Sequence, residues 1–142
     1  IRNVSSSNRD DYEAAHEAGS KILSVRDVRR LGVDGVLALI PQNINYYITI
    51  DIDGFDPSIA PGTGTPSHGG FLYYEVLEII QALAKRSKGS IVGMDLVEVA
   101  PVYDPTGMTS ILAAQLLLNS IGFIFHERGK VRAAAESEAT LA

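Results

Sequence analysis

Two aspartates at the end of an apolar run are the residues of this chain best suited to chemistry. Residues 46–50 are aromatic and β-branched, which is typical of a strand, and Asp51 and Asp53 follow them. Side chains two positions apart on a strand share a face, so both carboxylates would point together, with α-carbons about 6–7 Å apart. Carboxylates suit divalent cations such as Mg²⁺ and Mn²⁺, which makes both aspartates candidate metal ligands. The alternative is that they cap the following turn.

The segment after these acids is a stiff loop. Residues 56–70 contain three prolines and four glycines, which cannot continue a strand or a helix. Asp56 precedes Pro57, and we predict that it forms a turn that fixes the loop. His68 also lies in this loop, and we interpret it as solvated. A strand that delivers acids into such a loop is typical of a ligand site at the carboxyl end of a parallel sheet.

A second acidic position lies at the end of the next apolar run. Residues 90–99 are apolar up to Asp95, and Glu98 stands near the far end of the predicted strand. A carboxylate there is suited to a planar guanidinium, which it can bind through two parallel hydrogen bonds. The alternative is a surface glutamate or a partner of a nearby arginine. Asp95, three positions earlier, points to the other face and is interpreted as structural.

Both acidic blocks resemble a known family. Residues 51–66 read DIDGFDPSIAPGTGTP and residues 93–101 read GMDLVEVAP. They are similar to the two signature blocks of the ureohydrolases, the arginase and agmatinase family, in the same order and at the expected separation. The resemblance extends from about Ile1 to Phe125 and is strongest with agmatinases and guanidino-acid hydrolases.

The resemblance implies a fold, an activity and roles for three residues. It implies part of a three-layer α-β-α sandwich with a mostly parallel sheet, and hydrolysis of a guanidino compound, such as agmatine, to urea and an amine. Asp51 and Asp53 would be ligands of a pair of Mn²⁺ ions, with Ni²⁺ as a possible substitute, and Glu98 would contact the guanidinium of the substrate. A homo-oligomer, trimeric or hexameric, is also implied.

The chain lacks other signatures of that family. An early histidine motif and an Asp-Ala-His-x-Asp motif are absent, and His16, His68 and His126 lie in other contexts. No catalytic proton-transfer residue is therefore assigned. We expect the chain to correspond to the C-terminal half of a ureohydrolase, without the N-terminal strands, and to show no turnover alone.

Two other functions fit some of these features. The chain would be a non-catalytic subunit or remnant if it pairs with a complete homologue through its apolar strands and the apolar residues 111–125. A receiver-like or nucleotide-binding α/β module would need a phosphate loop, but Thr65 is followed by Pro66 and no Gly-Lys-Ser/Thr sequence is present. The first alternative is the stronger of the two.

Hydrophobic periodicity and turn residues predict the elements that position these acids. One domain is expected over residues 1–127, with a tail over 128–142 that is either a frayed helix or disordered. Ser24 and Asp27 form a capping-box pattern, and Gly32 interrupts the helix that it opens. The predicted helices cover residues 10–18, 25–30, 33–40, 71–87 and 109–126; the predicted strands cover 46–50, 90–99 and, weakly, 21–24.

Composition excludes several classes of partner and site. The 142 residues carry a net charge of −5 and no basic cluster, so neither nucleic acid nor an anionic membrane is expected as a partner. The chain has no cysteine, which excludes disulfides and thiolate metal sites. The apolar run over 111–125 is shorter than a spanning helix needs. We therefore expect a cytoplasmic protein that acts on a small molecule.

Overall fold

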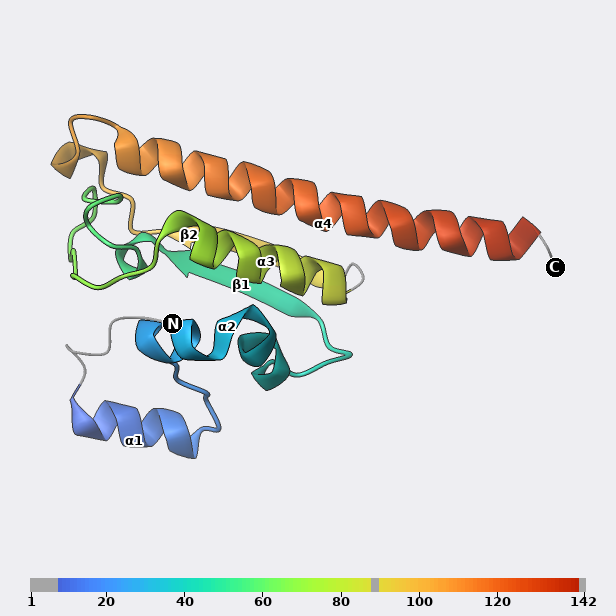
Figure 1. The fold of residues 1–142 in the computed structure, drawn as a ribbon, viewed down its shortest axis with the longest axis horizontal. Coiled ribbons are helices and arrows are strands. Elements are labelled where there is room, and N and C mark those ends of the chain that lie inside the picture. The colour runs from blue at the N-terminus through green and yellow to red at the C-terminus, as the bar shows by residue number, and fades with distance from the viewer. Residues whose placement is uncertain (1–7, 88–89, 141–142) are drawn as a thin grey trace.

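A computed structural model describes residues 8–87 and 90–140 of the chain (Figure 1). Four helices and two strands make up this part, and two short 3₁₀ turns follow the strands. In chain order the elements are α1 (Arg9–Glu17), α2 (Val25–Leu39), β1 (Tyr46–Asp51), η2 (Ile52–Gly54), α3 (Tyr73–Ser87), β2 (Ile91–Val97), η3 (Pro101–Tyr103) and α4 (Met108–Thr140).

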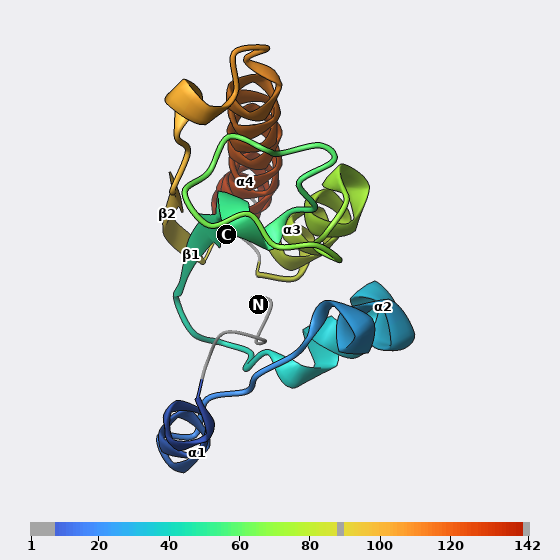
Figure 2. The same cartoon turned by 90° about the vertical axis from the view of Figure 1, so that its left-hand side faces the viewer.

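The two strands are parallel neighbours, with α3 between them in the chain. Tyr47 pairs with Gly93 and Asp51 pairs with Val97, after an irregularity in the register next to Tyr46. Both views show α3 and α4 side by side along the strands, and α1 far from α4 (Figures 1 and 2). This is a βαβ arrangement, and it agrees with the predicted α/β class as a partial domain with an arginase-like fold.

Local sequence signals explain the boundaries of the first two helices. The Ser24 hydroxyl accepts a hydrogen bond from the Asp27 backbone N–H, and the Asp27 carboxylate accepts one from the Ser24 N–H, so the predicted capping box is confirmed. Gly32 has φ 66°, and this non-helical residue kinks α2 where the sequence predicts an interruption. The prediction of a strand over residues 21–24 is wrong, because that segment has no regular structure. Its last residue, Ser24, is the N-cap of α2.

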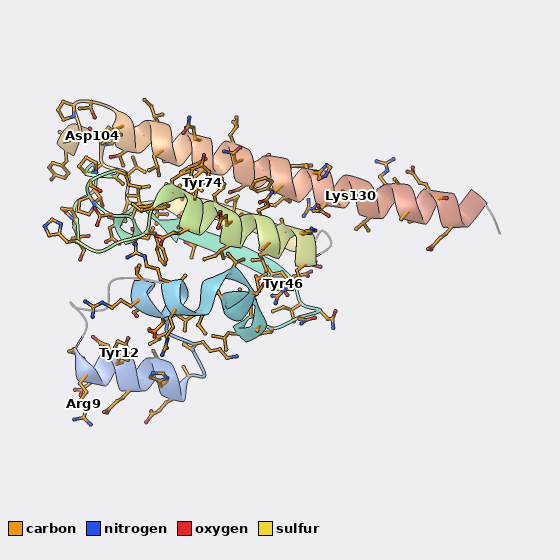
Figure 3. The ribbon with its side chains drawn as sticks, in the orientation of Figure 1. Arg9, Tyr12, Tyr46, Tyr74, Asp104 and Lys130 are labelled. Atoms are coloured by element: carbon orange, nitrogen blue, oxygen red, sulfur yellow. The ribbon has the colours of Figure 1, made fainter. Side chains whose placement is uncertain are left out.

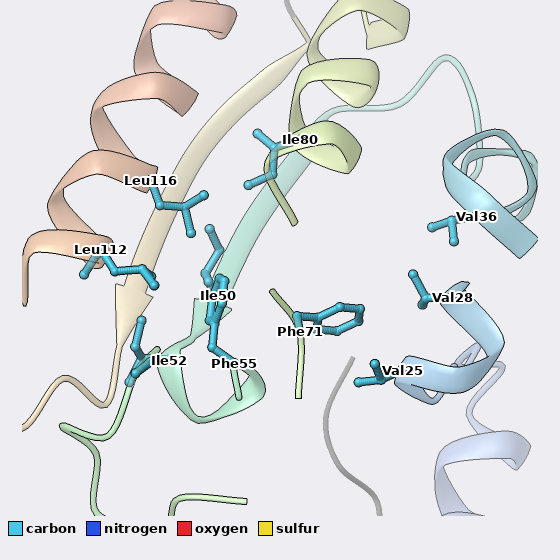
Figure 4. Close-up of a cluster of buried hydrophobic side chains, with 12 residues drawn as sticks. Val25, Val28, Val36, Ile50, Ile52, Phe55, Phe71, Ile80, Leu112 and Leu116 are labelled. Carbon is cyan, nitrogen blue, oxygen red and sulfur yellow. The ribbon is translucent and has the colours of Figure 1, made fainter. Parts of the chain in front are cut away.

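The core lies where α2, α3 and α4 meet the strands. Figure 4 shows Ile50, Phe55, Phe71 and Leu116 among its central side chains. Phe55 is 2% exposed and Leu116 is 0% exposed, so both are fully removed from water. A second cluster lies toward the other end of the strands and comprises Leu37, Tyr46, Leu83, Ala84, Ile91 and Ile124.

Within residues 8–87 and 90–140, one face of the sheet is covered and the other is open. Tyr46 and Ile50 are buried, whereas Tyr47 is 63% exposed and Thr49 is also exposed, so burial alternates along β1. This pattern holds for the part of the chain that the structure describes. The apolar residues on the open face are left without a covering layer there.

Helix α4 is longer than the helix predicted over residues 109–126, and its outer side is exposed. Leu112, Leu116 and Ile124 face the core, but Leu118 is 75% exposed and Phe125 is 64% exposed. Residues 128–140 continue the helix. By length and composition alone α4 is long and apolar enough to cross a membrane. One side of α4 packs against α3 and β2, and the core helix of a folded domain packs in the same way.

Candidate metal and substrate site

Asp51 is the last residue of β1 and caps the turn that follows. Its Oδ1 accepts a hydrogen bond of 3.1 Å from the Asp53 backbone N–H, and the Phe55 N–H donates to the Ile52 carbonyl at 3.1 Å. The backbone therefore turns into η2 directly after Asp51. The capping interpretation is confirmed for Asp51, and its role as a metal ligand stays a prediction.

Asp53 lies in that turn and not on the strand. The premise that Asp51 and Asp53 share a strand face is wrong, because the strand period ends at Asp51. Asp53 is 4% exposed, and its Oδ2 accepts a hydrogen bond of 2.7 Å from the Thr65 hydroxyl. A buried carboxylate held by a loop residue replaces the second acid of the expected strand pair.

Asp56 closes the loop that Thr65 belongs to. Its Oδ1 accepts the Ser58 N–H at 3.0 Å and its Oδ2 accepts the Gly69 N–H at 2.9 Å, which confirms the predicted turn-forming role. The bonds from Ser58 and then from Gly69 lower the pKa of Asp56, with a smaller contribution from the positive charge of His68. His68 itself is exposed.

Close backbone contact at Gly70 completes the closure of the loop. The Phe71 N–H donates to the Gly54 carbonyl at 2.9 Å, and the Asp56 N–H donates to the Phe71 carbonyl at 3.0 Å. A Cβ atom on Gly70 would lie 2.3 Å from the Phe55 carbonyl carbon. This position therefore requires glycine.

The middle of the loop is tied to α4 and to the segment after β2. The Gly62 N–H donates to the Thr109 hydroxyl at 2.8 Å, and the Gly62 carbonyl accepts the Ala100 N–H at 2.7 Å. Thr109 is fully buried, and a Cβ on Gly62 would lie 2.9 Å from its Oγ1. One glycine therefore connects the loop to two other segments.

Asp104 holds the start of α4 at this end of the molecule (Figure 3). Its Oδ1 accepts the Thr106 hydroxyl at 2.5 Å and its Oδ2 accepts the Thr109 N–H at 2.7 Å. The bonds from Thr106 and then from Thr109 lower the pKa of Asp104 to about 2. The charged carboxylate also suits the N-terminus of a helix.

Glu98 follows β2 at the same end of the sheet as Asp51. Asp51 pairs with Val97, so Glu98 lies one residue beyond the partner of Asp51. Glu98 is exposed and has φ 66°, a left-handed conformation that is rare for residues other than glycine. Strained backbone of this kind is common at functional sites.

Asp95 has the structural role that its phase predicts. Its carboxylate accepts the Tyr47 hydroxyl at 2.9 Å and the Thr49 hydroxyl at 2.5 Å, across the two strands. The hydrogen bond to Asp95 raises the pKa of Tyr47. These contacts fix the register of β1 against β2, and so the relative positions of Asp51 and Glu98.

The donor set for a metal is incomplete in the described residues. Asp51 and Asp53 lie two positions apart and offer the oxygen ligands that Mn²⁺ accepts. Across residues 8–87 and 90–140, no group of three histidine, aspartate or glutamate side chains is arranged to hold a metal ion. The two aspartates therefore fit part of a metal site and not a whole one.

Comparison with known proteins identifies the group to which these blocks belong. A sequence model of the arginase family matches residues 1–122. This chain belongs to the arginase family. It is 40% identical over 124 residues to the agmatinase of Sodalis glossinidius, across 85% of this chain and 39% of that protein. It is 39% identical over 109 residues to proclavaminate amidinohydrolase of Streptomyces clavuligerus, across 75% of this chain and 33% of that protein.

A solved structure agrees with this assignment. The agmatine ureohydrolase of Thermoplasma volcanium superimposes with a TM-score of 0.73 at 33% identity, over 87% of this chain and 40% of that one. The arginase-family chain described here therefore spans two fifths or less of the length of these three proteins.

Several residues of this arginase-family site were not found by sequence reasoning. Thr65, Thr109 and Asp104 hold the loop and its acids, and none of them was singled out as a site residue. One signal was available: Asp104 stands shortly before a long apolar helix, where a capping acid is favoured. The contact between Thr65 and Asp53 spans 12 positions of an irregular loop and follows from no periodic pattern.

Proposed function

We propose that this chain carries part of the catalytic site of an amidinohydrolase of the agmatinase type. The intact enzyme would hydrolyse a guanidino compound to urea and an amine. The observation that supports this most directly is the register of two paired parallel strands, which places Glu98 one residue beyond the partner of Asp51 at their carboxyl ends. The names of the agmatinase, agmatine ureohydrolase and proclavaminate amidinohydrolase relatives support a guanidino or amidino substrate.

In this proposal Asp51 and Asp53 hold Mn²⁺, or Ni²⁺ in its place. When bound, such a metal pair lowers the pKa of a water molecule and makes it a nucleophile at neutral pH. Asp51 is held by the Asp53 N–H and Asp53 by the Thr65 hydroxyl, so neither side chain has to be ordered on binding. The remaining ligands would come from a part of the family fold that lies outside this sequence.

Glu98 would bind the guanidinium of the substrate. Its carboxylate is exposed at the edge of the sheet and can accept two parallel N–H bonds. Its strained backbone is held by the Ala100 N–H, two residues on, which donates to the Gly62 carbonyl of the loop. Glu98 would therefore orient the substrate relative to Asp51 and Asp53, which precede the same loop in the chain.

A complementation experiment tests the proposed activity. The N-terminal part of the Sodalis glossinidius agmatinase, up to the start of the matched region, would be co-expressed with this chain, and urea would be measured with Mn²⁺ added. The substrates are agmatine, a guanidino acid and guanidine. We expect no urea from this chain alone, urea from the complemented pair, and loss of activity in Asp53→Asn and Glu98→Gln.

Urea release from the chain alone would contradict the proposed ligand set. A pair that forms a stable complex, binds Mn²⁺ and leaves every substrate intact would favour the second candidate, a non-catalytic subunit or remnant that pairs with a complete homologue. The uncovered face with Tyr47, and Leu118 on α4, favour that candidate, because apolar side chains there have no covering layer in the described residues. A homo-oligomer of trimeric or hexameric form, in the cytoplasm, is proposed for the intact enzyme.

A further inference from the structure

We propose that a polar cavity at the amino end of β1 binds a small tetrahedral oxyanion of the phosphate class, with the Arg86 guanidinium as its main contact. The cavity has a volume of about 310 Å³ and is lined by Gln42, Asn43, Tyr46, Arg86, Ser87 and Ser90. Tyr46 is the first residue of β1 and Asp51 is the last, so the two ends of this strand lie about 16 Å apart. The site is therefore independent of the roles proposed for Asp51, Asp53 and Glu98.

The lining of this cavity is rich in hydrogen-bond donors and carries one formal charge. Guanidinium, amide and hydroxyl groups supply the donors, and none of the six lining residues is acidic. The Ser87 hydroxyl already donates to the Ala84 carbonyl at 3.0 Å. The other donors come from three segments, the turn at residues 42–43, Arg86 on α3 and Ser90 before β2. Donors from several directions around one positive charge suit a tetrahedral oxyanion better than a planar carboxylate.

The Arg86 side chain is held in place and still has donors to offer. Its Nη1 donates to the Leu37 carbonyl, and its Nη2 donates to the Ile40 carbonyl at 3.4 Å, both at the carboxyl end of α2. Its Nε is buried and has no hydrogen-bond partner among the residues that the structure describes. A guanidinium has five N–H donors, so two carbonyl bonds fix its position and leave capacity for a further acceptor.

A second arginine between the same two helices shows what Arg86 lacks. The Arg29 guanidinium donates to both carboxylate oxygens of Glu75, at 2.7 and 3.1 Å, and to the Gly70 carbonyl at 3.0 Å. Within residues 8–87 and 90–140, Arg86 forms no ion pair, although its side chain is half-buried. Partial removal of a cation from water without a counter-anion is costly. A bound oxyanion would supply to Arg86 the charge that Glu75 supplies to Arg29.

The walls of the cavity are fixed by hydrogen bonds of their own. The Tyr46 hydroxyl donates to the Pro41 carbonyl at 2.5 Å, which closes the turn between α2 and β1. The Tyr46 N–H donates to the Ser90 carbonyl at 2.9 Å, and the Ser90 N–H donates to the Ser87 carbonyl at 3.0 Å. Walls that are ordered before binding reduce the entropy that an ion loses the protein on binding, which favours a specific site.

The test is a titration of the full ¹⁵N-labelled chain with inorganic phosphate at constant pH and ionic strength. We expect saturable shifts of the backbone amides of residues 42–46 and of the Arg86 Nε–H resonance. Arg86→Gln should raise the half-saturation concentration about 10–100-fold, because it removes the charge-assisted hydrogen bonds to the ion. Arg26→Gln removes the same charge from an exposed position of α2 and should leave the half-saturation concentration within about twofold of the wild type.

A second variant keeps the test decisive if Arg86→Gln disturbs the fold. Asn43 has φ 59°, which glycine adopts without strain, so Asn43→Gly removes one amide of the lining and leaves the backbone as it is. It should raise the half-saturation concentration about 2–10-fold. Urea unfolding of each variant without phosphate shows whether the fold is retained, and Asn43→Gly should unfold close to the wild-type midpoint.

The outcomes separate an anion site from an arginine that only caps α2. A wild-type half-saturation concentration in both Arg86→Gln and Asn43→Gly, or no saturable shift in the wild type, overturns the site and leaves Arg86 as a cap. Equal half-saturation concentrations for phosphate, acetate and chloride overturn it as well, because they show unselective attraction of anions. Phosphate binding that Arg86→Gln weakens and Asp51→Asn leaves unchanged supports the site, whatever the outcome for the proposed metal ligands.

Discussion

Two regions of this molecule differ in how far their polar groups are hydrogen-bonded and their apolar groups are buried. At the carboxyl ends of the strands, Asp53, Asp56 and Asp104 all accept hydrogen bonds from loop residues, and the loop is tied to α4 through Thr109. Along the open face of the sheet and the outer side of α4, large apolar side chains such as Tyr47 and Leu118 are exposed instead.

A cavity lies beside β1 and the turn that follows it. It has a volume of about 160 Å³ and is lined by residues of β1 and α3, among them Ile48, Asp51, Val76 and Ile79. In the described residues β1 is hydrogen-bonded to β2 alone, so its other edge has no strand partner. The loop end is therefore held by a network of hydrogen bonds, whereas the open face of the sheet and the outer side of α4 expose apolar side chains that no layer of the described residues covers.

The largest effect should come from comparing the two sides of α4. Leu116 is 0% exposed and Leu118 is 75% exposed. Leu116→Ala should lower the free energy of unfolding by about 2–5 kcal/mol through lost burial and the cavity left behind, whereas Leu118→Ala should change it by less than about 0.5 kcal/mol. Urea unfolding of both variants measures this. Equal costs would mean that both sides of α4 are covered in solution.

A smaller loss of stability is expected from adding a side chain at Gly70, where the end of the loop lies against the backbone of residues 55 and 56. A Cβ on Gly70 would lie 2.5 Å from the Asp56 backbone nitrogen, whereas a Cβ on Gly64 would meet nothing within 4 Å. Gly70→Ala should cost about 1–3 kcal/mol, and the control Gly64→Ala less than about 0.5 kcal/mol. Unfolding midpoints that coincide for the two variants would show that the loop is not closed as described.

Acid titration tests whether Asp104 holds the start of α4 through its hydrogen bonds. The folded-state pKa of Asp104 is about 2, against 3.8 for the unperturbed group, so the unfolded state binds more protons between these values and stability rises with pH there. This contribution is complete above about pH 4 and is lost as pH falls through about 2. Asp104→Asn should flatten the pH dependence of the urea midpoint over that interval. An unchanged slope would mean that Asp104 is not held by Thr106 and Thr109.

The smallest effect concerns the backbone strain at Glu98. Glu98 has φ 66°, a conformation that glycine adopts without strain. Glu98→Gly should therefore leave the free energy of unfolding unchanged or raise it by up to about 1 kcal/mol. Glu98→Gln keeps the strain and removes the charge, which makes it the matched control. Urea unfolding compares the two. A clear loss of stability in Glu98→Gly would show that the glutamate side chain supports the fold.

Sequence reasoning predicted the features that depend on neighbouring residues. The capping box at Ser24, the kink at Gly32 and the turn at Asp56 were all predicted, because each depends on contacts within a few positions or on the backbone preference of one residue. The α/β class was also predicted, whereas the roles of Asp51, Asp53 and Glu98 stay predictions.

Features that depend on distant contacts were not predicted. The strand period placed Asp53 beside Asp51, but the Asp51 cap turns the backbone before that position. The apolar content of α4 does not show which of its sides are buried, because burial depends on which elements are present to cover a helix. Thr109 is far from Gly62 in sequence, so the bond between them could not be predicted from spacing.

The central claim is that Asp51 and Asp53 form half of a divalent-metal site, and electron paramagnetic resonance of free Mn²⁺ tests it most directly. Titrating Mn²⁺ into this chain should show weak binding that Asp51→Asn and Asp53→Asn each remove, while Asp34→Asn, at an exposed position of α2, leaves it unchanged. Absence of binding in the wild type, or binding that survives both substitutions, would contradict the account.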